Sequence, residues 1–206
     1  MPNYRGIEIE ELDEEVKQRQ EQYDKLHEAE EEKPSALREF LSWVLPIGLA
    51  ILIVWLLKTY VIINAHVPSG SMENTIMTND NLIGFRLAYA FGDVERGDVI
   101  IFYAPDKPEE KYIKRVIGLP GETVTISNAC VYIDGQLLEE DYLMEEWTVM
   151  NDGLEYQVPA GSYFVMGDNR NHSEDARYWQ NTYVTDDMIL GKAIFVYWPF
   201  ADAKGL

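Results

Sequence analysis

The sequence predicts a mainly β protein, in which an antiparallel β-sheet domain is anchored by one N-terminal transmembrane helix. Three observations support this fold class. Residues 40–57 form a run of 18 residues without a charged side chain. After residue 66, short runs of β-branched and aromatic residues are separated by turn residues, which is typical of antiparallel strands. No helical period of 3.6 residues continues after the apolar run.

The N-terminal segment is strongly acidic. Residues 1–33 hold 12 Asp or Glu against 5 Lys or Arg, and such charge runs are usually solvated. We expect residues 1–39 to form an acidic cytoplasmic tail, either a solvated helix or a disordered segment, and the sequence identifies no partner for it.

The apolar run has the length of a membrane span. At 1.5 Å per residue, 18 helical residues measure about 27 Å, close to the thickness of the hydrocarbon layer. If Lys58 snorkels to the interface, the span continues to Ile63, so the anchor is expected at residues 40–63. Lys33 and Arg38 precede it and weakly favour a cytoplasmic N-terminus. About forty residues precede the run, which argues against a cleaved signal peptide.

The rest of the chain, residues 64–206, is expected to form an extracytoplasmic β-rich domain. Asp134-Gly135 is a hairpin signal, and Pro120-Gly121 marks another turn. The expected strands lie within residues 81–87, 98–103, 112–118, 122–127, 130–138, 161–168 and 191–198.

Composition limits the possible chemistry. The chain has 206 residues, 47% hydrophobic, and a formal net charge of −19, so a packed core is expected, whereas a nucleic-acid partner is not, because clustered Lys and Arg are missing. Cys130 is the single cysteine, and the histidines are His27, His66 and His172. Neither an intramolecular disulfide nor a cysteine-based zinc site is possible, and we expect no metal and no cofactor.

Ser71, in the stretch "VPSGSM" (residues 67–72), is a candidate nucleophile. A serine hydroxyl attacks poorly until a base removes its proton, and "SGS" alone is also an ordinary loop sequence. His66 and His172 are possible bases, but each is equally compatible with a surface position. Lys114 is the third candidate base.

Lys114 lies in "YIKRVIGLPG" (residues 112–121), where strand alternation places it on one face with Tyr112 and Val116. Loss of hydration on an apolar face lowers the pKa of a lysine, which would make Lys114 a base near neutral pH. The alternative is that Lys114 snorkels to the strand edge and stays charged.

A third stretch, "MGDNRNHSEDAR" (residues 166–177), decides between these alternatives. In this order, "VPSGSM", "YIKRVIGLPG" and "MGDNRNHSEDAR" closely resemble the bacterial type I signal peptidases, and "RGDVIIF" (residues 96–102) resembles a further strand of that family. The resemblance implies an integral-membrane serine endopeptidase that removes signal peptides from exported preproteins. It also implies a Ser-Lys dyad on a mainly β domain outside the cytoplasm.

The resemblance assigns a role to individual residues. Ser71 is similar to the family's nucleophile and Lys114 to its general base. Ser69 would stabilise the oxyanion with its hydroxyl, alongside the backbone N–H of Ser71, and Ser173 would orient the Lys114 amine. The residues that resemble the family's structural ion pair are Asp175 and Arg177.

The chain departs from the family pattern at three positions, none of them in the dyad. Asn74 stands where proline is usual, His172 where asparagine or aspartate is commoner, and Ala176 where serine is usual. These differences concern the rigidity and polarity of the site rather than its chemistry.

The expected partners are secretory preproteins with small residues at the −3 and −1 positions, and the lipid bilayer. An extended substrate would pair with a sheet edge by β-augmentation. The expected location is the cell membrane, with a single span, a cytoplasmic N-terminus and an extracytoplasmic catalytic domain.

Three other functions stay open from the sequence. The chain could be a catalytically inactive, membrane-anchored scaffold of the export or pilus machinery, although it retains Ser71, Lys114 and Ser173 together. It could be a relative of the self-cleaving Ser-Lys repressors, against which the anchor and the lack of a DNA-binding segment argue. It could be a histidine-dependent signal peptidase, against which Lys114 in its "YIKR" context argues.

Overall fold

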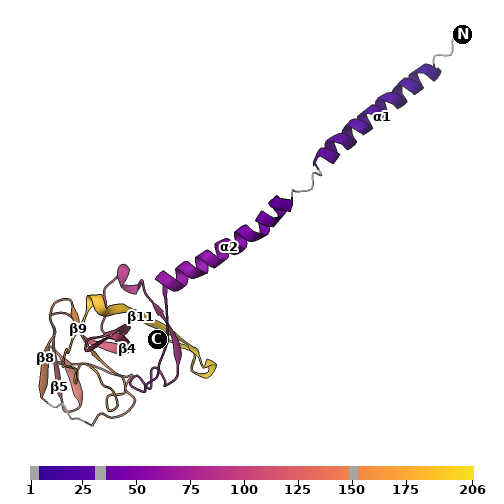
Figure 1. Cartoon of the computed structure of the whole chain (residues 1–206). Helices are drawn as coiled ribbons and strands as arrows, with labels where there is room; N and C mark the ends of the chain where they lie inside the picture. The colour runs from indigo at the N-terminus through magenta and orange to yellow at the C-terminus, as the bar shows by residue number, and fades with distance from the viewer. Residues whose placement is uncertain (1–4, 31–35, 149–152) are drawn as a thin grey trace. The chain divides into compact units, whose positions relative to one another are not determined.

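The computed structural model describes residues 5–30, 36–148 and 153–206 (Figure 1). The chain divides into two compact units, Met1–Ile53 and Val54–Leu206. In the first unit, helix α1 (Arg5–Glu30) corresponds to the acidic tail, and helix α2 (Ala36–Tyr60) begins there and ends in the second unit. All the strands of the described chain belong to the second unit.

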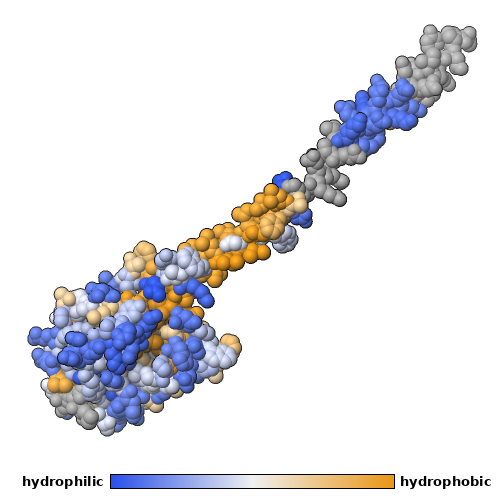
Figure 2. Space-filling model, viewed as in Figure 1, coloured by the Kyte–Doolittle hydropathy of each residue, from blue (hydrophilic) through white to orange (hydrophobic). Residues whose placement is uncertain are grey.

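Helix α2 is the candidate membrane span. It contains the whole uncharged run, none of its side chains is buried, and its surface is mostly hydrophobic in Figure 2. Among the described residues it is the one helix long and apolar enough to cross a bilayer. Its 25 residues correspond to about 37 Å of helix, which exceeds the hydrocarbon thickness.

The helix ends at Tyr60, three residues before the expected boundary at Ile63. Strand β1 (Ile62–His66) begins two residues after Tyr60 and pairs with β2 (Asn81–Phe85), placing Ile63 opposite Gly84. Ile63 is only 3% exposed and packs in the core of the domain. Burial against β2 therefore removes Ile63 from the anchor, and the expected continuation of the helix past Tyr60 is wrong.

The second unit contains two antiparallel sheets. The larger sheet has eight strands in the order β1-β2-β11-β3-β4-β9-β10, with β12 also paired to β11. The smaller has four, in the order β7-β6-β5-β8. The remaining strands are β3 (Val99–Ala104), β4 (Lys107–Gly118), β5 (Thr123–Ser127), β6 (Cys130–Ile133), β7 (Gln136–Leu137), β8 (Leu154–Gln157), β9 (Ser162–Met166), β10 (Val184–Thr185), β11 (Ile189–Trp198) and β12 (Lys204–Gly205). Short 3₁₀ helices lie at Ala88–Ala90, Asp186–Met188 and Phe200–Asp202.

All seven expected strand regions contain a strand, and the mainly antiparallel fold is confirmed. Asp134 and Gly135 both have positive φ, 49° and 80°, in the turn between β6 and β7, which matches a primed hairpin turn. At the second expected turn, the N–H of Glu122 donates to the Leu119 carbonyl and Gly121 has a φ of 89°. The sequence reading missed β1, β8, β10 and β12.

Two clusters of buried side chains form the core. One lies between the two sheets and includes Ile100, Phe102, Val124 and Phe164, and the other packs β1 and β2 against β3 and β11. Strand β4 contributes side chains to both clusters: Val116 belongs to the first, and Ile113 packs against the second. Lys114, between them, is therefore held on a well-packed strand.

Candidate active site

The segment that follows β1 holds Ser71 in a fixed turn. The N–H of Ile76 donates to the Met72 carbonyl at 2.7 Å, and both side chains are fully buried. From the other side, the N–H of Asn169 donates to the Ser71 carbonyl at 3.1 Å, and its Nδ2 donates to the Gly70 carbonyl at 3.0 Å. Ser71 is consequently held by buried neighbours and by a distant loop, and only 7% of it is exposed.

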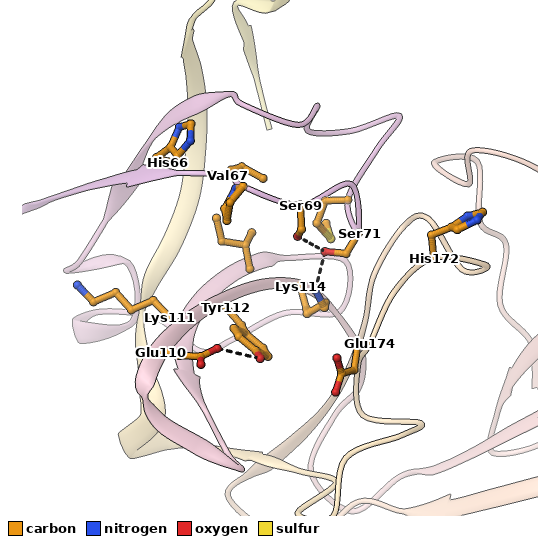
Figure 3. Close-up of a pocket in the computed structure, with 13 residues that line it drawn as sticks. His66, Val67, Ser69, Ser71, Glu110, Lys111, Tyr112, Lys114, His172 and Glu174 are labelled. Carbon is orange, nitrogen blue, oxygen red and sulfur yellow. Dashed lines mark hydrogen bonds between the residues drawn. The ribbon is translucent and has the colours of Figure 1, made fainter.

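Lys114 meets Ser71 across this turn. The Nζ atom of Lys114 lies 2.7 Å from Ser71 Oγ, within hydrogen-bond distance (Figure 3). Lys114 is 5% exposed, so the alternative that it snorkels to the strand edge is wrong. Ser69 Oγ lies 3.5 Å from Ser71 Oγ, and the three side chains converge at one point of the surface.

Burial sets the basicity of Lys114. Loss of hydration lowers the pKa of Lys114 from its ordinary 10.5 to about 8, although the negative charges of Asp175, Asp168 and Glu174 oppose this change. Its Nζ lies 5.7 Å from the centre of the Tyr112 ring, which agrees with the expected common face of the two side chains. A large fraction of the amine is therefore neutral near pH 8 and can accept a proton.

Ser173 does not make the contact expected of it. Its side chain is buried, but among the described residues Ser173 Oγ has no hydrogen-bond partner, whereas Lys114 Nζ is directed at Ser71 Oγ. Ser173 instead packs on Gly167, where an added Cβ would overlap both Ser173 Oγ and the Ser71 carbonyl oxygen. Gly167 thus separates Ser173 from the Ser71 backbone.

Asp175 and Arg177 form a fully buried ion pair. Arg177 Nε and Nη2 donate to the two carboxylate oxygens of Asp175 at 2.7 and 2.9 Å. The turn that such a pair requires is present, because the N–H of Tyr178 donates to the Asp175 carbonyl at 2.8 Å. Asp175 also accepts from the N–H of Gly167 at 2.9 Å, so the pair supports the loop that carries Ser173.

A second bidentate pair was not expected from the sequence. Arg115 donates from Nε and Nη2 to Asp168 at 2.8 and 2.6 Å, and Thr75 Oγ1 bonds both side chains. Strand alternation turns Arg115 to the face opposite Lys114, and Asp168 belongs to the third motif. No spacing rule joins residues 53 positions apart, so the sequence offered no direct signal for this pair.

A third pair joins Arg170, in the loop that carries Ser173, to Glu140. Arg170 binds Glu140 through two nitrogens, at 3.0 and 2.5 Å, and both side chains are almost fully buried. The Trp147 ring lies 5.2 Å from the guanidinium groups of both Arg170 and Arg177. Trp147 therefore packs against the cations of both pairs.

Ser71 and Lys114 line a cavity of about 580 Å³. Residues 110–114 of β4 form one wall, and residues 66–72 form another. β3 pairs with one edge of β4, while β9 pairs with the other edge only at residues 115–118. In the part of the chain that the structure describes, the edge of β4 that faces away from β3 thus has no strand partner along residues 110–114.

Neither candidate histidine forms a hydrogen bond with Ser71 in the described structure. His66 and His172 line the cavity, but no hydrogen bond of the described residues joins either of them to Ser71. His172 Nδ1 lies 3.3 Å from Asn169 Oδ1 and the side chain is 75% exposed. Within residues 5–30, 36–148 and 153–206 there is also no cluster of side chains able to hold a metal ion.

Comparisons with known proteins identify relatives over most of the chain. A family model described as signal peptidase, peptidase S26, matches residues 40–198. Signal peptidase I of Leptolyngbya laminosa is 38% identical over 178 residues, covering 81% of this chain and 84% of that protein. Signal peptidase I of Bacillus caldolyticus is 36% identical over 167 residues, covering 75% and 90%.

Among solved structures, a signal peptidase I from Enterococcus faecalis V583 is 34% identical, with a TM-score of 0.43, and the match covers 49% of this chain and 97% of that one. The family match covers helix α2 from residue 40, Ser71, Lys114 and the loop of Ser173. The chain belongs to the signal peptidase family, peptidase S26.

Proposed function

We propose that this protein removes signal peptides from secretory preproteins with Ser71 as the nucleophile and Lys114 as the general base. Membership of the family makes the chain a serine peptidase that acts on secretory preproteins. The observation that carries the residue assignment is the 2.7 Å approach of Lys114 Nζ to Ser71 Oγ within a buried site. A base at hydrogen-bond distance is the geometric requirement for activating a serine.

Acylation begins with proton transfer within this pair. Neutral Lys114 accepts the Ser71 hydroxyl proton as Oγ attacks the carbonyl carbon of the scissile bond. The tetrahedral intermediate collapses when Lys114 returns the proton to the departing amine, which becomes the N-terminus of the mature protein. The signal peptide then remains bound to Ser71 as an ester.

Deacylation uses the same base. Lys114 takes a proton from a water molecule that attacks the ester, and it returns the proton to Ser71 Oγ as the signal peptide leaves. We assign the oxyanion site to the N–H of Ser71 and the hydroxyl of Ser69, because donors placed where negative charge develops stabilise the transition state. The 3.5 Å separation of Ser69 Oγ from Ser71 Oγ supports this role.

The other site residues act through the dyad. We assign Ser173 the orientation of the Lys114 amine. Its buried hydroxyl, which has no partner among the described residues, is available for that contact when the amine moves off Ser71. The Asp175–Arg177 pair is a structural support, because both side chains are buried and bonded to each other.

The cavity suits an extended substrate. A peptide that pairs with the open edge of β4 at residues 110–114 would point alternate side chains, −1 and −3, to the same side. Val67, Met72 and Ile113 supply apolar walls for these side chains. We therefore propose small residues at −1 and −3.

We propose three regions for the chain: an acidic cytoplasmic tail (1–39), a single span, and an extracytoplasmic catalytic domain (64–206). The uncharged run 40–57 has Lys33 and Arg38 before it and Lys58 after it, and the excess of positive charge on the tail side favours the cytoplasm. Labelling with a membrane-impermeant maleimide in intact cells tests this, using Gln20→Cys and Glu155→Cys in a Cys130→Ser background. Labelling at Glu155→Cys alone is expected, and labelling at Gln20→Cys alone would reverse the orientation.

The function is tested by cleavage of a fluorogenic peptide with Ala at −3 and −1 by the full-length protein in detergent. The wild type is compared with Ser71→Ala and Lys114→Met. Cleavage by the wild type and its loss in both variants are expected. A folded wild type that cleaves nothing would favour the scaffold alternative, and activity retained by Lys114→Met would eliminate the proposed base.

A further inference from the structure

Of the two carboxylates in the cavity wall, Glu110 and Glu174, only Glu174 has no side-chain partner among the described residues. Its side chain points into the cavity that contains Ser71 and Lys114 (Figure 3). Within the described residues it takes part in no hydrogen bond and in no ion pair within 4 Å. Glu110, the other acidic residue of the wall, accepts from the Tyr112 hydroxyl at 3.2 Å and lies 3.7 Å from Lys107 Nζ.

The cations of the cavity do not neutralise Glu174. The Lys111 side chain points away from Ser71 (Figure 3), and Lys114 loses its charge as the pH rises through its pKa of about 8. The negative charge of Glu174 raises the pKa of Lys114 in the cavity wall and of Lys107 outside it, so Glu174 acts on nearby cations although it forms no ion pair with them. Above pH 8, where Lys114 is mostly neutral, a substrate in the cavity therefore meets a Glu174 carboxylate that forms no ion pair within the described part of the chain.

We propose that Glu174 is a specificity-determining residue that favours preproteins with a Lys or Arg side chain close to the scissile bond. This inference rests on the proposed function, since the same cavity must receive the substrate. Glu174 and Ser71 line the same cavity, so a cation that Glu174 attracts lies within a few residues of the bond cut at Ser71. Both partners stay exposed to solvent, and such pairs are weak and sensitive to salt. We expect a preference of about two- to fivefold.

The test uses the full-length protein in detergent at a pH above 8, where Lys114 is mostly neutral, and a neutral parent peptide with Ala at −3 and −1 and Gln at −4, −2 and +2. Lys or Glu replaces one Gln at a time. At one or more of these positions, the wild type is expected to cleave the Lys peptide with a kcat/KM about two- to fivefold above that of the Gln peptide, through a lower KM. The Glu peptide should be cleaved more slowly than the Gln peptide. Glu174→Gln and high salt should both bring these ratios close to one.

Glu109→Gln is the matched control. Glu109 is an exposed residue of β4 outside the cavity wall, so this variant makes the same change in net charge and should keep the wild-type ratios. Comparing peptides within each variant cancels any effect of Glu174 on the basicity of Lys114.

Two results overturn the inference while leaving the proposed function intact. The first is that Glu174→Gln keeps the wild-type kcat/KM ratios at all three peptide positions. The second is that Glu109→Gln loses the preference for Lys as fully as Glu174→Gln does, because the preference would then come from the net charge of the protein. Failure of the wild type to cleave the neutral parent is a different result, because it contradicts the proposed function itself and the inference with it.

Discussion

Lys114 Nζ lies 2.7 Å from Ser71 Oγ, although 43 residues separate the two in the chain. The contact forms because β4 carries Lys114 under the turn that follows β1, where both side chains are almost fully buried. Burial does two things here: it fixes the geometry of the pair, and it removes water from the amine. The position of Lys114 in the sheet therefore determines both its contact and its basicity.

The rate of peptide cleavage is expected to rise with pH through an inflection near 8. Only the neutral amine accepts the Ser71 proton, and burial lowers the pKa of Lys114 from 10.5 to about 8, so the active form accumulates above pH 8. A kcat/KM profile from pH 6 to 10 measures the inflection. Lys114→Arg, which keeps its charge, should lose activity by a factor of about 100 or more. An inflection near 10.5 in the wild type would contradict a buried base.

Burial of Lys114 should also cost stability. Folding lowers the pKa of Lys114, so between pH 8 and 10.5 the unfolded chain binds more protons than the folded one. The loss of folding stability caused by the buried charge is therefore complete below pH 8 and disappears above pH 10.5. The change in pKa corresponds to about 3 kcal/mol, and loss of the hydrogen bond to Ser71 offsets about 1 kcal/mol. We expect Lys114→Met to raise the free energy of unfolding by about 2 kcal/mol at pH 7.

This prediction is measured by urea unfolding of the full-length protein in detergent, followed by tryptophan fluorescence. The gain of Lys114→Met should shrink between pH 7 and pH 10. The exposed neighbour Lys111 provides the control, because Lys111→Met removes the same charge from the surface and not from a buried position. A variant less stable than the wild type at pH 7 would mean that the charged amine is well solvated in the folded protein.

The strands that the sequence revealed are those with a clear alternating or β-branched pattern and a turn on either side. β4 is an example, because alternation in "YIKRVIG" placed Lys114 beside Tyr112, as the structure has them. β1 was missed because "IINAH" directly follows an apolar helix and reads as its continuation. Pairing with β2, in which Ile62 lies opposite Phe85 and His66 opposite Asn81, is what makes it a strand.

The site was predictable where a motif identifies a residue, and unpredictable where a contact joins distant segments. Ser71, Lys114 and Ser173 were named from three motifs, but motifs do not say how side chains point, and the expected contact of Ser173 with Lys114 is missing from the described structure. The Arg115–Asp168 and Arg170–Glu140 pairs span 53 and 30 residues. Only the packed fold brings such charges together.

Removing one charge of the Asp175–Arg177 pair should destabilise the domain strongly. Asp175→Asn leaves the Arg177 guanidinium buried without a counterion, and such changes cost about 3–5 kcal/mol. The melting temperature should fall by several degrees or more, and cleavage activity should fall with it. Asp141→Asn, at an exposed position, makes the same chemical change and should stay within about 0.5 kcal/mol of the wild type. Equal melting temperatures for the two variants would contradict a supporting role for this pair.

Gly167 is the position where the smallest change should do the most damage to catalysis. An added Cβ would overlap the Ser71 carbonyl oxygen and Ser173 Oγ, and it would lie only 2.6 Å from Ser173 Cβ. The Ser71 oxygen is backbone, so it cannot move without displacing the Ser71 side chain from Lys114. We expect Gly167→Ala to reduce kcat/KM for the Ala-x-Ala peptide by at least about tenfold, because misplacing reacting groups by about 1 Å costs up to about 100-fold.

Gly205→Ala provides the comparison, because a Cβ at residue 205 meets no atom within 4 Å. Its activity and melting temperature should match those of the wild type. For Gly167→Ala, the loss should appear in kcat more than in KM, since the cavity wall along β4 is unchanged while the Ser71–Lys114 distance is not. If Gly167→Ala cleaves the peptide at the wild-type rate, Ser71 is not held in place by the packing of this loop.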